Sequence, residues 1–117
     1  MRAYAVAALL VLAAPTHDVG AAPVPRPTDD LRRLDYLFGI ALECVLVDTA
    51  VIEGYTARTA AIVARLGLSD AARRHTRAAA LIAVDREWAN RGLGGYRGWC
   101  RTEGADAAAL FTGVPTP

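Results

Sequence analysis

The sequence contains no lysine, only one methionine and two cysteines, and almost no excess of either charge. Its formal net charge is +1 at pH 7. Proteins that bind nucleic acid usually concentrate basic charge on one face, so this balance gives no reason to expect nucleic acid as a partner. The absence of lysine together with many alanines suggests a GC-rich bacterial genome and implies nothing about mechanism.

The sequence also lacks the motifs that accompany common catalytic and cofactor sites. It has no haem-attachment motif, no glycine-rich phosphate loop, no nucleophile elbow and no zinc-ligand spacing. His75 has no second ligand one helical turn further on, because position 79 is alanine. We therefore expect no metal, no cofactor and no enzymatic activity.

No apolar run is long enough for a stable membrane span, which needs about 20 residues. The longest run, residues 3–14, follows Met1 and Arg2 and has the length of a secretory signal core. Small side chains at 19–21 then suit cleavage after Ala21. Residues 1–21 are predicted to be a cleavable signal peptide, which makes the mature chain periplasmic or secreted; the alternative is a retained N-terminal anchor.

Two cysteines, Cys44 and Cys100, remain in the mature chain. Paired cysteines are typical of exported proteins, so we expect one disulfide, with two unpaired structural thiols as the alternative. Closing so long a loop is worth about 4 kcal/mol in the chain-entropy model. That is a large share of the ~5–15 kcal/mol that stabilises an ordinary domain.

A proline-rich tether at residues 22–28 precedes a helical domain at residues 29–113. Thr28 or Asp29 can cap the first helix. Apolar residues recur at steps of three and four beyond position 60, which predicts a helix over 29–53 with a bend at Gly54. The segment 55–66 is either its continuation or a separate helix.

Later helices have clearer boundaries. Gly67 ends the preceding segment, and Ser69 can cap a helix that runs to about Asn90. Residues 92–98 contain four glycines and are expected to form a loop. Thr102 then caps a short last helix that stops at Gly113, and the tail 114–117 is expected to fray.

No segment alternates with the two-residue period of a strand. The predicted fold is all-α: a small antiparallel bundle of three to four helices closed by one disulfide.

The glycine-rich segment carries the first candidate site. Tyr96, Arg97, Trp99 and Arg101 lie close together there, and these residue types are enriched in binding hot spots. A neighbouring disulfide would hold them in place and lower the ordering cost of binding. The alternative is that Tyr96 and Trp99 simply fill the end of the bundle.

Asp48 is the second candidate, because it falls on the same apolar stripe as Val45 and Ile52. A buried carboxylate must be paired or protonated. We expect a structural ion pair with an arginine such as Arg86 or Arg97. The alternative is a functional acid in a cavity between helices.

Basic residues cluster at the start of the third helix. Arg73, Arg74 and Arg77 could contact an anionic lipid or cell-wall polymer, although such a run is usually a solvated face.

Small size, export, a disulfide and an aromatic and arginine loop together favour a protein-binding module of the immunity, envelope-stress or accessory-subunit type. Its partner is expected to be another envelope or secreted protein. The alternative is a small-ligand carrier or weak enzyme with Asp48 in its cavity.

Overall fold

The computed structural model describes residues 23–113. The predicted signal peptide at 1–21 and the tail at 114–117 lie outside the described residues. In the described part of the tether, residues 23–28 form no helix and end in a turn. There the amide of Arg26 donates to the Asp29 carboxylate at 2.7 Å.

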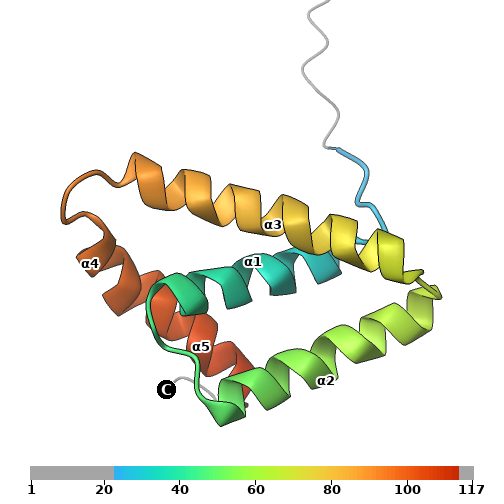
Figure 1. Ribbon diagram of the computed structural model, residues 1–117. Helices are drawn as coiled ribbons and strands as arrows, with labels where there is room; N and C mark the ends of the chain where they lie inside the picture. Colours follow the sequence, from blue (N-terminus) through green and yellow to red (C-terminus); the bar gives the residue numbers. More distant parts are fainter. Residues whose placement is uncertain (1–22, 114–117) are drawn as a thin grey trace, which may run out of the picture.

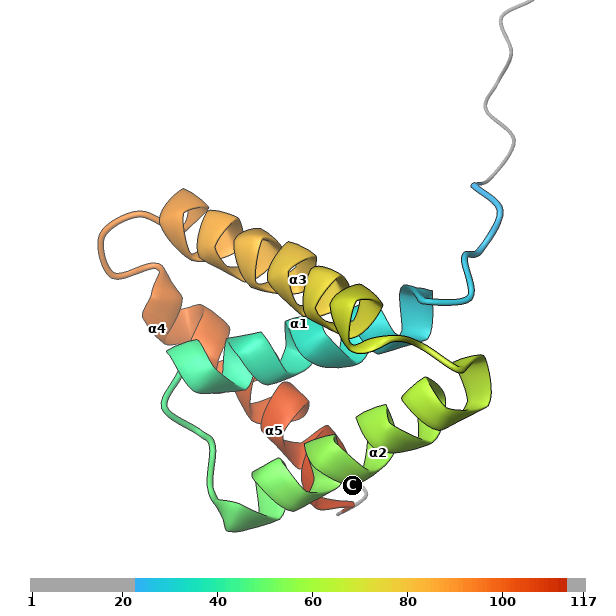
Figure 2. The same cartoon turned by 45° about the vertical axis from the view of Figure 1, so that its right-hand side comes forward.

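Four helical rods account for most of this part of the chain, and it contains no strand. They are α1 (Asp29–Glu43), α2 (Thr49–Leu66), α3 (Asp70–Asn90) and a last rod of three consecutive pieces. That rod comprises α4 (Tyr96–Trp99), a π-helix (Cys100–Gly104) and α5 (Ala105–Thr112). Successive rods reverse direction, and α1 lies in the middle with α3 on one side and α2 and α5 on the other (Figures 1 and 2). The prediction of a small helical bundle with one disulfide is confirmed.

Helix boundaries follow the expected capping chemistry at several ends. The Ser69 side chain accepts a hydrogen bond from the amide of Ala72 and so caps α3. Gly67 ends α2 in the left-handed conformation with φ 60°. Thr28, by contrast, makes no side-chain cap bond at the start of α1.

The predicted helix over 29–53 is wrong, because the chain breaks after Glu43 and α2 starts afresh at Thr49. Val45 takes the left-handed conformation with φ 57°. Its amide donates to the carbonyl of Leu42, and the Leu46 amide donates to that of Ala41. These two bonds form the same helix stop that Gly67 makes, with valine in the position that usually holds glycine.

Gly54 does not bend α2, which continues through it. It lies instead where α2 meets the end of α5. A Cβ placed on Gly54 would stand 1.8 Å from the carbonyl oxygen of Phe111. The glycine therefore permits close approach of two backbones.

The glycine-rich loop is shorter than expected, since α4 already begins at Tyr96. Thr102 does not cap the last helix, because it lies inside the π-helix and its hydroxyl donates to the carbonyl of Gly98 at 3.0 Å. The Ala105 amide donates to the carbonyl of Cys100, five residues earlier, which is the π-helical spacing. Gly113 ends α5 with φ 68°, as predicted.

Two apolar clusters fill the interior on the two sides of α1. The first contains Ile40, Val84, Trp99 and Ala107. The second contains Val51, Tyr55 and Phe111. Within residues 23–113, no helix combines the length and apolar character needed to cross a membrane.

Candidate functional site

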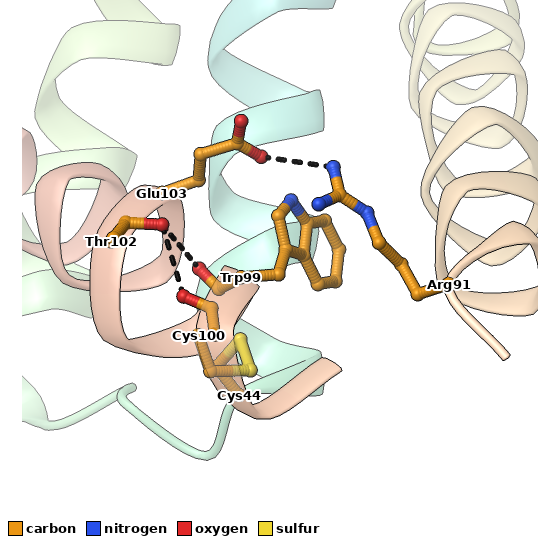
Figure 3. Close-up of a disulfide and its surroundings, with 7 residues drawn as sticks. Cys44, Arg91, Trp99, Cys100, Thr102 and Glu103 are labelled. Atoms are coloured by element: carbon orange, nitrogen blue, oxygen red, sulfur yellow. Dashed lines mark hydrogen bonds and ion pairs between the residues drawn. A yellow bond between two sulfur atoms is a disulfide. The ribbon is translucent and has the colours of Figure 1, made fainter. Parts of the chain in front are cut away.

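The disulfide joins the end of α1 to the start of the π-helix (Figure 3). The Cα atoms of Cys44 and Cys100 are 5.3 Å apart. Gly104 is buried against this bond, and a Cβ there would stand 2.9 Å from the Cys44 Sγ. The covalent link thus fixes α4 and its neighbours against α1.

Trp99 points inward from this link. Its side chain is 2% exposed, and its indole Nε1 is buried with no hydrogen-bond partner. The Arg91 guanidinium lies 5.2 Å from the Trp99 ring centre, and Trp88 meets the ring edge-on at 6.0 Å. That Trp99 belongs to a binding loop stays a prediction, and its side chain is part of the core.

Arg91 links α3 to the π-helix above that indole (Figure 3). It donates to the Glu87 carboxylate at 2.6 Å and lies 3.5 Å from that of Glu103. Burial raises the pKa of the nearby Tyr36 phenol, and the negative charges of Glu87 and Glu103 raise this pKa further. These contacts tie the end of α3 to the disulfide region.

The two arginines of the predicted loop face outward, whereas its tyrosine packs against α3. Arg97 and Arg101 are exposed, and neither makes an ion pair within the described residues. Tyr96 is half-buried and stacks on Trp88 at a ring-centre distance of 4.8 Å. Leu93, in the loop before α4, is fully exposed.

Further apolar side chains are exposed beside Cys44. Val45 is 89% exposed, Leu42 47% and Leu46 38%. We name residues 42–46 and 93–101 the disulfide end. Both views place the end of α1, the loop before α4 and α4 itself at one end of the molecule (Figures 1 and 2).

Asp48 is not the buried acid that the sequence predicted. It is exposed and caps α2, with its carboxylate accepting from the Val51 amide at 2.9 Å. The apolar stripe seemed to continue through this position only because the break at 44–48 carries apolar residues. Neither Arg86 nor Arg97 pairs with it in the structure.

The buried acid is Asp35 on α1, which is 2% exposed. Its carboxylate accepts two hydrogen bonds from Arg73 on α3, at 2.6 and 2.7 Å. The Tyr55 hydroxyl on α2 donates to the same carboxylate at 2.7 Å. This network connects three helices, and both carboxylate oxygens accept hydrogen bonds, so it has the character of a structural ion pair.

The network shifts the pKa values of two of its members. Burial and the hydrogen bond to Asp35 raise the pKa of the Tyr55 phenol above 10.0. The same carboxylate raises the pKa of Arg73. Asp35 was not predicted, although in the sequence it lies one helical turn after Leu31 and three residues before Phe38.

This network also corrects the prediction of a three-arginine basic face on α3. The Arg73 side chain is 15% exposed and is bound to Asp35. Arg77 donates to the Tyr55 hydroxyl at 3.2 Å. Arg74 and Arg77 are both exposed, and of the three arginines Arg74 alone makes no side-chain hydrogen bond within the described residues.

Within residues 23–113, no group of three or more histidine, cysteine or carboxylate side chains is placed to hold a metal ion. No family model, no curated protein and no solved structure matches this chain.

Proposed function

We propose that this chain is an exported protein-binding module and that the disulfide end is its interface. Support comes first from Arg97 and Arg101, two exposed guanidinium groups four residues apart that have no carboxylate partner in the described part of the chain. Arg73 and Arg91, which hold helices together, do pair with carboxylates of this chain. Exposed arginines on a covalently fixed helical segment suit a carboxylate of another protein.

The exposed apolar side chains of this end support the same proposal. Leu93 is fully exposed, and Val45 presents its side chain to solvent from a left-handed backbone that costs about 1–2 kcal/mol for a β-branched residue. A partner with a small apolar pocket would cover these side chains. The partner we propose is an envelope or secreted protein that presents an acidic patch beside such a pocket.

The disulfide itself supports the proposed location. Such bonds persist in oxidising compartments, which include the periplasm and the extracellular space. A role as an immunity, envelope-stress or accessory protein fits this location. The alternative of a carrier or weak enzyme required Asp48 to lie in a cavity between helices. That residue instead caps a helix at the surface.

The test is affinity capture from an envelope extract with the oxidised protein. Trp99→Ala is unsuitable, because removing a core side chain would disturb the fold. A triple variant, Leu93→Ser with Arg97→Ser and Arg101→Ser, changes exposed residues only. We expect it to bind the captured partner about thirtyfold more weakly, since hot-spot losses reach 2 kcal/mol or more.

A matched control changes the same charges elsewhere. Ile82→Ser with Arg74→Ser and Arg86→Ser alters three exposed residues of α3 and should leave binding unchanged. Equal affinity of the two triple variants for the partner would contradict the proposed interface.

A further inference from the structure

A shallow groove runs between α1, α2 and α5, away from the disulfide end. Its volume is about 320 Å³, within the usual range for small-ligand pockets. Apolar side chains form its lining on all three helices: Leu34, Leu37, Ile62 and Leu110.

The polar part of the groove is dominated by arginine. Arg33 of α1 and Arg58 and Arg65 of α2 all line it, against the single carboxylate of Asp30. None of the three arginines makes an ion pair within residues 23–113. Arg58 and Arg65 are seven residues apart and so lie on one face of α2. The groove therefore combines an apolar lining with unneutralised positive charge.

A second groove of about 220 Å³ adjoins the first and shares Arg33, Leu37 and Leu110 with it. Its far part is lined by Glu103 and Asp106. These carboxylates repel an anion, whereas the α2 side attracts one. An elongated ligand with a single negative charge thus has a preferred orientation, with its charge beside Arg58 and Arg65.

We infer that this groove binds a free fatty acid, with the carboxylate at Arg58 and Arg65 and the acyl chain on the leucine and isoleucine side chains. The apolar lining offers nothing to a short inorganic anion, and a neutral lipid lacks the negative charge that the three arginines would attract. The groove shares no residue with the disulfide end. Either proposal can therefore fail without the other.

The probe is laurate, titrated below its micelle-forming concentration into the oxidised protein and followed by calorimetry. Dodecanol has the same chain without the charge, and inorganic phosphate has charge without the chain. We expect saturable laurate binding, weaker dodecanol binding and no phosphate binding. Arg58→Gln with Arg65→Gln should weaken laurate binding at least about tenfold, because two charge-assisted hydrogen bonds are lost.

Arg74→Gln with Arg86→Gln is the matched control, because it removes two exposed arginines of α3 outside the groove. It should bind laurate like the unmodified protein. Circular dichroism verifies that both variants fold. The proposal is overturned if laurate shows no saturable binding, if dodecanol binds equally well, or if the two double variants bind laurate alike.

Discussion

Asp35 is the one acidic side chain that the described residues bury completely, and its environment shows how the bundle admits a charge. Arg73 and Tyr55 reach it from two other helices, so three helices are oriented by one carboxylate. Such pairs contribute little net stability, yet removing one member leaves the other charge desolvated.

We expect Asp35→Ala to lower the free energy of unfolding by about 3 kcal/mol, because Arg73 would keep a largely buried charge without its counterion. Chemical denaturation measures this change. Asp85→Ala, which removes an exposed carboxylate from α3, should cost less than about 0.5 kcal/mol. A comparable loss in the two variants would show that the Asp35 pair is unimportant.

Tyr55 makes stability depend on alkaline pH. Its pKa is raised above 10.0 in the folded state, so the unfolded chain loses the phenol proton first. The stabilisation is complete below about pH 10 and is lost as pH rises toward the folded pKa. In Tyr55→Phe, the free energy of unfolding should fall less steeply above pH 10.

Denaturation at several pH values checks this slope, and the Tyr55→Phe variant retains Tyr36, whose raised pKa contributes a decline of the same sign. Comparing slopes rather than absolute values removes the constant loss of the Tyr55 hydrogen bond. Parallel curves for the two proteins would refute the assignment.

At the scale of elements, the helix stop at Val45 is the least expected feature. It has the hydrogen bonds of the stop at Gly67 but a β-branched residue at its left-handed position. The disulfide at Cys44 and the contact of Leu46 with the Gly104 region hold the chain in this path.

Val45→Gly should raise the free energy of unfolding by about 1 kcal/mol, since it relieves the left-handed strain and sacrifices a side chain that is 89% exposed. The reverse change, Gly67→Val, should lower it by a similar amount at the other stop. Denaturation midpoints compare the two. A destabilised Val45→Gly variant would mean that the valine contributes packing that its exposure conceals.

Gly54→Ala has an expected effect opposite to that of helix propensity. Alanine in place of an interior helical glycine normally adds up to about 1 kcal/mol. Here the new methyl group would collide with the backbone of Phe111, so we expect a loss of about 2 kcal/mol or more. Thermal unfolding decides between the signs, and a raised melting temperature would exclude the close crossing of α2 and α5.

These elements also show what the sequence could reveal. Three helix ends could be predicted because their residues have ordinary capping chemistry: Ser69, Gly67 and Gly113. The end of α1 carries no such residue, so the apolar periodicity continued through the break and made Asp48 look buried. The direction of Trp99 depends on the π-helix and on contacts with α3, which no local pattern encodes.

At the scale of the whole molecule, the disulfide connects segments separated by 56 residues. The pairing was predicted from the presence of two cysteines together with the expectation of export. The arrangement of the other helices around α1 could not be predicted. It depends on Gly54 and Asp35, whose partners lie on other helices.

Replacing both cysteines, Cys44→Ser with Cys100→Ser, should lower the free energy of unfolding by about 4 kcal/mol, because the unfolded chain regains the freedom of a long loop. Denaturation of the variant beside the oxidised protein measures this loss. A difference below about 1 kcal/mol would indicate that the last rod docks on α1 without covalent help.

The π-helix has a consequence for how this fold tolerates insertions and deletions. The buried positions of the last rod are Trp99, Gly104, Ala107 and Phe111, spaced five, three and four residues apart. Omitting one residue at Thr102 would convert that spacing to four, three and four, the ordinary α-helical repeat. The rod thus behaves as an α-helix that has absorbed one supernumerary residue, and a shorter chain could present the same inward side chains without it.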